Sequence, residues 1–232
     1  MSEQHVLDNP IRASLLGPHA HFAVRHGSAV RYPPDVCPFV ALPDEPDLGA
    51  WTDLAALVGP DATAAVSAPR VEPPPGWEVL AEIAAVQLVD AGVEVDPDPE
   101  AVVLGPADVP EMLALVERTR PGPFLPRTVE MGTYLGIRHG GELVAMAGER
   151  LHPPGWTEIS AVCTDVRFRG RGLATRLVLA VAAGIRERGE IPLMHAAVSN
   201  VNAIRLYESL GFTLRRHTRF VGLRALADAA VA

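Results

Sequence analysis

An arginine- and glycine-rich segment, VRFRGRGLATRL, runs from Val166 to Leu177 directly into an amphipathic helix pattern. The first turn of a helix leaves backbone N–H groups unpaired, and the helix dipole adds roughly half a positive charge there. Gly170 and Gly172 let the backbone approach an anion, and Arg169 and Arg171 add positive charge. The segment therefore predicts a phosphate or pyrophosphate site, with a solvated basic turn as the alternative.

A second segment, NVNAIRLYESLGF from Asn200 to Phe212, follows an apolar strand pattern. Together with the spacing RxxGxA of Arg169, Gly172 and Ala174, it resembles the two hallmark motifs of the GNAT superfamily of N-acetyltransferases. A dinucleotide-binding loop is a weaker alternative, because Thr175 stands where its final glycine would be. The resemblance is closest to the branch that includes the C-terminal parts of glycine N-acyltransferase-like enzymes.

The resemblance implies acetyl-CoA as the acyl donor and no metal. It implies that the strand before the arginine-glycine loop pairs with the pantetheine arm, that the loop holds the pyrophosphate, and that the second motif contacts the pantetheine and the thioester. The residues thereby assigned to the donor are Val162, Cys163, Thr164, Arg169, Gly170, Arg171, Gly172, Leu173, Ala174, Thr175, Asn200, Ala203 and Tyr207.

Tyr207 shares a helix face with Ala203 and Leu210, and a tyrosine on an apolar stripe is usually a core residue. The resemblance instead implies that Tyr207 is the general acid that protonates the departing CoA thiolate. Proton transfer of this kind contributes typically about 10²–10⁴ to the rate.

The implied reaction is direct attack of a primary amine on the acetyl carbonyl in a ternary complex, with a backbone N–H near Val162 stabilising the oxyanion. Deprotonating a lysine-like amine at pH 7 costs about 4.6 kcal/mol, whereas an α-amine costs about 1–1.4 kcal/mol. Glu149 and Glu158 are the candidate catalytic bases, because each lies near the end of a central strand. Ordinary solvated strand-end carboxylates are the alternative.

The elements that must position these residues follow from apolar periodicity. A helix carries Leu173, Leu177, Val181 and Ile185 on one stripe and ends at Gly189. The fold class is α/β with mixed α+β character, a GNAT-like central mixed sheet flanked by helices. The predicted elements are a strand at 101–104, a helix at 106–118, a hairpin of 132–138 and 142–149, a strand at 157–164, helices at 172–188 and 200–210, a strand at 191–198, and two strands within 212–223.

The acidic, proline-containing segment Val93–Glu100 has the composition of a linker and suggests a domain boundary. We expect an N-terminal α+β domain of unknown role at 1–95 and an acetyl-CoA-binding catalytic domain at 96–232. The N-terminal patterns predict two strands around His26, a helix at 51–58 and a strand at 62–67, whereas 77–89 fits a helix or a strand. This domain is expected to cover one side of the acceptor cleft.

A net charge of −8 argues against nucleic-acid binding, and neither a membrane span nor a signal peptide is evident. With two cysteines, the chain is expected to be cytoplasmic, and a homodimer is an alternative to a monomer. His19, His21, His26 and Cys37 match no zinc spacing, so the histidines are expected in exposed loops.

The acceptor is expected to be a small-molecule or peptide amine, contacted by the loops at 119–131 and 152–156. The alternative function is a catalytically weak acyl-CoA-binding sensor or interaction module.

Overall fold

A twisted sheet of eight strands forms the centre of the computed structural model, which describes residues 5–226. The strand order is β4-β11-β5-β10-β9-β8-β7-β6. The pair β9–β10 is parallel, and the other neighbouring strands of this sheet pair antiparallel, as expected for a mixed sheet. The strands are β4 (Thr63–Ala68), β5 (Trp77–Asp90), β6 (Val102–Leu104), β7 (Tyr134–His139), β8 (Glu142–Glu149), β9 (Trp156–Thr164), β10 (Ile191–Ala197) and β11 (Phe212–Ala225).

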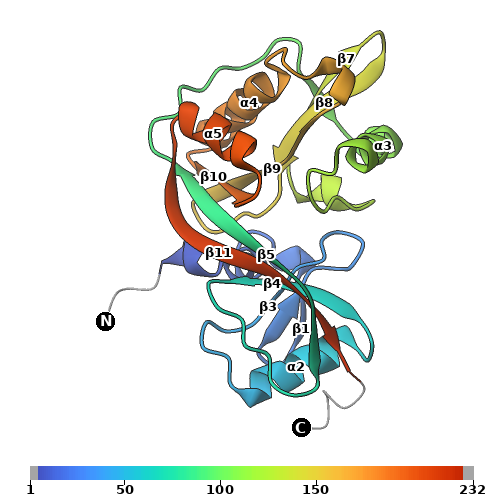
Figure 1. Ribbon diagram of the computed structural model, residues 1–232, viewed down its shortest axis with the longest axis vertical. Helices are drawn as coiled ribbons and strands as arrows, with labels where there is room; N and C mark the ends of the chain where they lie inside the picture. The colour runs from blue at the N-terminus through green and yellow to red at the C-terminus, as the bar shows by residue number, and fades with distance from the viewer. Residues whose placement is uncertain (1–4, 227–232) are drawn as a thin grey trace.

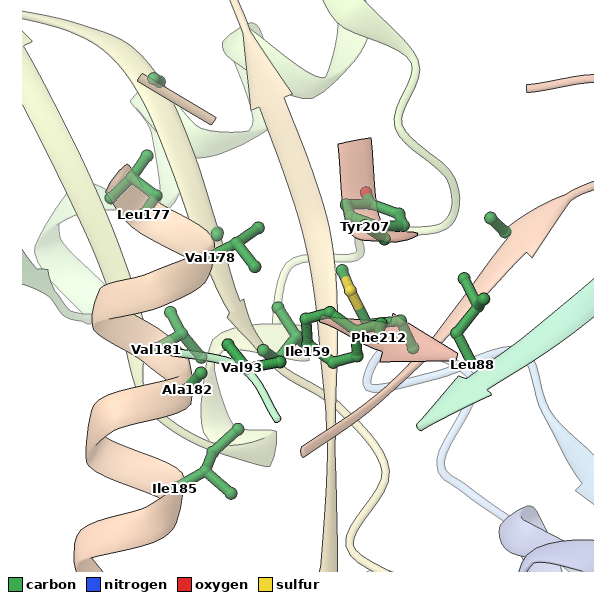
Figure 2. Packing of buried hydrophobic residues seen from close by; sticks show 14 of the residues in the cluster. Leu88, Val93, Ile159, Leu177, Val178, Val181, Ala182, Ile185, Tyr207 and Phe212 are labelled. Carbon is green, nitrogen blue, oxygen red and sulfur yellow. The ribbon is translucent and has the colours of Figure 1, made fainter. Parts of the chain in front are cut away.

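Helices cover both faces of the sheet in its C-terminal half. The predicted apolar stripe of α4 (Leu173–Glu187) packs on one face together with α5 (Val201–Ser209), where Leu177 and Val181 approach Ile159 and Phe212 (Figure 2). Helix α3 (Val109–Thr119) packs on the opposite face through Met112 and Leu115. The expected fold class is therefore confirmed in this half of the chain.

The N-terminal region adds a three-stranded sheet of β1 (Val24–His26), β2 (Ala29–Arg31) and β3 (Val40–Ala41), with helices α1 (Pro10–Leu16) and α2 (Leu48–Val58). Five short 3₁₀ turns among the described residues complete the elements: Val6–Asp8, Ala20–Phe22, Pro106–Asp108, Thr128–Met131 and Val166–Phe168. The two strands predicted around His26, the helix and β4 are present close to the expected bounds.

The ambiguous segment at 77–89 is a strand, β5, and it lies between β10 and β11 in the large sheet. Figure 1 shows β5 and β11 running side by side from the α4–α5 half of the molecule to the α2 half. The sheet thus contains strands from both sides of the expected boundary at residue 95. The division into two domains, 1–95 and 96–232, stays a proposal.

The two strands predicted within 212–223 are one strand of 14 residues, β11. Register shifts at Leu214/Arg216 and Gly222/Leu223 interrupt its pairing with β5 without ending it. A bulge of this kind increases twist while most ladder hydrogen bonds are kept. The prediction of two separate strands was wrong because the equally long β5 supplies a partner along the whole strand.

The acidic segment at 93–100 is fixed to the sheet and to α4. Val93 is 1% exposed in the core shared by α4 and the sheet, and the Asp98 carboxylate accepts hydrogen bonds of 2.6 and 2.8 Å from the Arg176 guanidinium. The hydrogen bond from Arg176 lowers the pKa of Asp98. This segment therefore has the composition of a linker, but it is an ordered connection held by an ion pair.

His19 corrects the expectation that the N-terminal histidines lie in exposed loops. Its side chain is buried, with Nδ1 2.9 Å from the Tyr32 hydroxyl and Nε2 3.1 Å from the Met131 carbonyl. His21 and His26 are exposed, as expected. Within residues 5–226 no group of three or more His, Cys, Asp or Glu side chains has a metal-binding arrangement, and no helix has the length and apolarity of a membrane span.

Tyr134 offers a test of core polarity. Its hydroxyl is buried without a hydrogen-bond partner within residues 5–226, and its ring packs against Gly148, where an added Cβ would lie 2.2 Å from a ring carbon. Tyr134→Phe removes an unsatisfied buried group and is expected to raise the free energy of unfolding by about 1 kcal/mol. Tyr32→Phe removes a hydroxyl bonded to His19 and is expected to lower it by about the same amount. Urea unfolding measures both; a destabilised Tyr134→Phe would contradict the expectation.

Candidate active site

The parallel ladder between β9 and β10 ends at the pair Ile159–Met194, and the two strands separate beyond it. Ala161 has a φ of 54°, and the register against β8 shifts between Met146 and Gly148 at this point. A non-glycine residue in the left-handed region costs about 1–2 kcal/mol and persists only where its surroundings enforce it. This bulge directs β9 away from β10 and opens the sheet.

A cavity of about 1020 Å³ occupies the opening. It is lined by both separated strands, by the arginine-glycine loop, by α5 and by residues 119–123, whereas residues 152–156, the other loop expected to contact the acceptor, do not line it. The predicted donor residues that line it are Val162, Cys163, Thr164, Arg169, Gly170, Gly172, Leu173, Ala174, Thr175, Asn200, Ala203 and Tyr207.

Arg171 is the predicted donor residue that does not line this cavity. Its guanidinium lies 5.0 Å from the ring centroid of Phe168, and it lines a separate hollow of about 540 Å³ with Arg138 and Arg176.

The arginine-glycine loop and the start of α4 present unpaired donors to the cavity. Gly170 and Gly172 have φ values of 75° and 74°, and nothing lies within 4 Å of a Cβ built on either. These glycines are therefore needed for the left-handed backbone, and open space lies in front of them. No side chain caps α4, and the first intrahelical bond runs from Arg176 N to Gly172 O. The geometry is that of an anion site.

Tyr207 is both a core residue and a cavity residue. Its side chain belongs to the cluster shown in Figure 2, where it lies beside Phe212, and it is 7% exposed. Burial, together with Cys163, raises the pKa of Tyr207 to about 12. The phenol therefore keeps its proton at neutral pH, as a general acid must.

Asn200 and Cys163 also have structural explanations. The Asn200 side-chain oxygen accepts a hydrogen bond from Ala203 N at 3.3 Å and caps α5. Cys163 is a free, buried thiol whose pKa burial raises to about 11, which fits the absence of a covalent intermediate in the expected reaction.

Glu158, one of the two expected bases, lies beneath the cavity and does not line it. Its carboxylate is fully buried and accepts hydrogen bonds from Arg150 at 2.7 and 2.9 Å and from His195 Nδ1 at 2.8 Å. Burial alone would raise the pKa of Glu158, but Arg150 and His195 hold it well below its usual range. This geometry is unsuited to accepting a proton from an amine, whereas the two partners, Arg150 and His195, do line the cavity.

Gln87 fixes the proton on His195. The Gln87 side-chain oxygen accepts a hydrogen bond from Arg215 at 2.8 Å, so its amide nitrogen donates to Leu7 O and to His195 Nε2, each at 3.0 Å. His195 Nε2 is then an acceptor, and Nδ1–H donates to Glu158.

Sequence reasoning missed this network, although a signal was present. His195 and Gln87 each interrupt an otherwise apolar strand, in IPLMHAAV and AAVQLV. A polar residue in a central strand needs a buried partner, which is a reason to single it out.

Glu149, the other expected base, points to the end of α4. Its carboxylate accepts a 2.8 Å hydrogen bond from Arg188 and one of 3.1 Å from Thr133 N, and it does not line the cavity. Glu149 is buried, so it is neither a cavity base nor a solvated carboxylate in this structure.

The N-terminal region closes one side of the cavity, with Phe39, Ala65, Ala81 and Ile83 among its lining residues. Phe39 stacks on Phe220 of β11 with ring centroids 5.4 Å apart. The charged residues of the lining are Arg120, Arg150 and Arg169, and none of the described lining residues is Asp or Glu.

The fold matches that of known acetyltransferases. The family model for FR47-like proteins matches residues 134–221. A crystal structure from Novosphingobium aromaticivorans, of a protein assigned to the GNAT family of acetyltransferases, is 43% identical over 95% of this chain and 98% of its own, with a TM-score of 0.88. A GCN5-related N-acetyltransferase from Kribbella flavida shares the fold, with 19% identity over 94% of this chain and 95% of its own and a TM-score of 0.60.

Two curated relatives match shorter stretches. A mycothiol acetyltransferase of Thermobispora bispora is 40% identical over 83 residues, 35% of this chain and 27% of its own length. The N-alpha-acetyltransferase RimI of Mycobacterium tuberculosis is 34% identical over 99 residues, 40% of this chain and 61% of its own length. The chain thus spans less than two thirds of either. Because the Novosphingobium aromaticivorans structure is 43% identical over 95% of this chain and 98% of its own, the chain belongs to the GNAT family of acetyltransferases.

The Arg150–Glu158 pair predicts a pH-dependent stability. Because the folded-state pKa of Glu158 lies below the unfolded value of 4.5, its contribution is complete above pH 4.5 and is lost as pH falls toward the folded pKa. We expect Glu158→Gln to cost about 3–5 kcal/mol of unfolding free energy at pH 7, because it leaves Arg150 unpaired. The cost should shrink by about 2 kcal/mol at pH 3.

Urea unfolding at both pH values measures this difference. Glu82→Gln, which removes an exposed partner of Arg219, is the matched control and should cost under about 1 kcal/mol at either pH. An equal cost of Glu158→Gln at pH 7 and pH 3 would contradict the expectation.

Proposed function

We propose that the protein transfers the acetyl group of acetyl-CoA to a primary amine by direct attack within a ternary complex. The observation that carries this proposal is a single cavity that joins the unpaired start of α4, Tyr207 and the N-terminal residues Phe39 and Ala65. One end suits the donor pyrophosphate, and the other has room for an acceptor.

The residues present fit the donor. Backbone N–H groups of Leu173, Ala174 and Thr175, with Arg169, would hold the pyrophosphate, and the unpaired edge of β9 at 162–164 would pair with the pantetheine amides. The same edge would supply an N–H to the carbonyl oxygen as negative charge develops. Tyr207 would give its proton to the departing thiolate.

The acceptor amine is proposed to be an α-amine. Glu149 and Glu158 are buried in ion pairs, and no described carboxylate lines the cavity to act as a strong base. The α-amine of a peptide, with a pKa near 7.7–8, loses its proton at a cost of only about 1–1.4 kcal/mol at pH 7, so water suffices. The α-amine of a free amino acid is more basic because of the adjacent carboxylate, so its deprotonation costs more than this but less than that of a lysine-like amine. The relative named N-alpha-acetyltransferase RimI supports this choice.

The N-terminal region is proposed to form the acceptor side, since Phe39, Ala65, Ala81 and Ile83 line the cavity there. The narrower assignment to a glycine N-acyltransferase-like branch stays a proposal that rests on the two motifs.

Thiol release from acetyl-CoA across a panel of α-amines, ω-amines and peptides tests the function. We expect turnover with α-amines and weak or no turnover with polyamines. Tight CoA binding without thiol release for any amine would instead support the acyl-CoA sensor.

Tyr207→Phe tests the general acid. With chemistry rate-limiting, we expect kcat to fall about 10²–10⁴-fold, because the thiolate then leaves without a proton, while the Kd of acetyl-CoA changes little. Tyr134→Phe is the matched control and should keep full turnover, since Tyr134 does not line the cavity. An unchanged kcat for Tyr207→Phe would exclude this role.

Arg169→Ala tests the donor end. Loss of a hydrogen bond to a charged group should raise the KM for acetyl-CoA about tenfold. The KM for acetyl-pantetheine, which lacks the pyrophosphate, should be unaffected. Arg171→Ala serves as the control, with a smaller effect expected because Arg171 lies outside the cavity lining. Equal effects on both donors would contradict a pyrophosphate contact.

A further inference from the structure

The hydrogen-bonded chain Arg150–Glu158–His195–Gln87 is costly to bury, and two of its members, Arg150 and His195, line the cavity. A buried ion pair is seldom more stabilising than apolar side chains of the same volume. All four side chains are nonetheless almost completely inaccessible. Stability alone is therefore a weak reason for this network.

The network holds the Arg150 guanidinium in one orientation. Glu158 binds Nε and Nη2, and the guanidinium carbon lies 4.9 Å from the ring centroid of Phe39. The third nitrogen, Nη1, has no hydrogen-bond partner among residues 5–226. Since Arg150 lines the cavity, this donor is available to a ligand.

The surroundings of Arg150 indicate the chemistry of that ligand. Phe39 and Phe220 form a stacked pair beside it, and Ile83 lines the same cavity. With no described carboxylate in the lining, the cavity offers nothing to a second positive charge on the acceptor. A carboxylate is the natural partner of a preorganised guanidinium.

We propose that the acceptor is an amino acid with an apolar side chain, whose carboxylate binds Arg150 and whose side chain packs against Phe39 and Phe220. Glu158 and His195 are positioning residues, which act by orienting Arg150. This assignment rests on the proposed acetyl transfer and adds the acceptor class to it.

The acceptor panel compares L-leucine, leucinamide, 3-methylbutylamine and glycine. Because the amine of leucinamide has a lower pKa than that of L-leucine, kcat/KM is expressed per concentration of neutral amine. For the natural chain, this value should be about ten- to a hundredfold higher for L-leucine than for leucinamide, the range expected for a hydrogen bond to a charged group. Glycine should be a poor acceptor because it lacks the apolar side chain. Equal values for L-leucine and leucinamide would overturn the carboxylate contact, and a preference for glycine would overturn the side-chain contact.

Variants assign the preference to Arg150. The double substitution Arg150→Met with Glu158→Gln removes both charges together and so avoids an unpaired buried ion. It should reduce the L-leucine to leucinamide ratio to within about threefold of unity, with the KM for acetyl-CoA little changed. Circular dichroism and thermal unfolding confirm that the variant is folded.

Glu158→Gln tests positioning, because Arg150 remains but loses the carboxylate that binds its Nε and Nη2. The same ratio should fall part of the way, through the KM for L-leucine, whereas a merely structural loss would lower activity on both acceptors equally. Arg120→Gly removes another lining arginine at a residue with a φ of 51°, where glycine is favoured. If this variant abolished the preference and the double variant did not, the assignment to Arg150 would be wrong.

Calorimetry separates failure of this inference from failure of acetyl transfer. L-leucine and leucinamide are titrated into the CoA-bound protein, so that carboxylate recognition is measured without turnover. Tighter binding of L-leucine, lost in the double variant, would support the inference even if no amine releases thiol, and that second result would refute the transferase alone. Equal binding of the two would refute the inference.

Discussion

The end of the parallel ladder between β9 and β10 is the constraint on which the site depends. Up to the pair Ile159–Met194, backbone hydrogen bonds hold the strands together, and beyond it the bulge at Ala161 directs β9 away. Backbone groups released from a sheet need other partners, and a polar ligand can provide them. The separation thus creates both the space of the cavity and the unpaired edge that faces it.

The β5–β11 pair determines what stands opposite that edge. Because β5 lies beside β10, a strand from the first hundred residues becomes part of the central sheet, and β11 continues to β4. This brings Phe39 and Ile83 to the cavity that the arginine-glycine loop also lines. The N-terminal region is therefore structurally joined to the cavity, and its place beside the acceptor stays a proposal.

The charged side chains at the two ends of the cavity differ in burial: Arg169 is exposed, whereas Arg150 is buried. At one end, which we propose binds the donor, Arg169 and the unpaired start of α4 face open space. At the other end, the charge of Arg150 is balanced by Glu158, and His195 and Gln87 complete the hydrogen bonding. In the proposed reaction, a dianionic pyrophosphate would tolerate solvent, whereas discrimination between small acceptors would require a donor held in a fixed direction.

The sequence by itself determined the local elements and the arginine-glycine loop at the start of α4, because a glycine loop, a helix start and an apolar stripe are all encoded within a few neighbouring residues. It also marked Tyr207. Only the tertiary structure decided that 77–90 is a central strand, that Glu149 and Glu158 are buried in ion pairs, and that Arg150 and His195 reach the cavity. Those outcomes depend on which strands become neighbours in the sheet. Strand neighbours are set by pairing between residues far apart in the sequence, whereas apolar periodicity reports only local secondary structure.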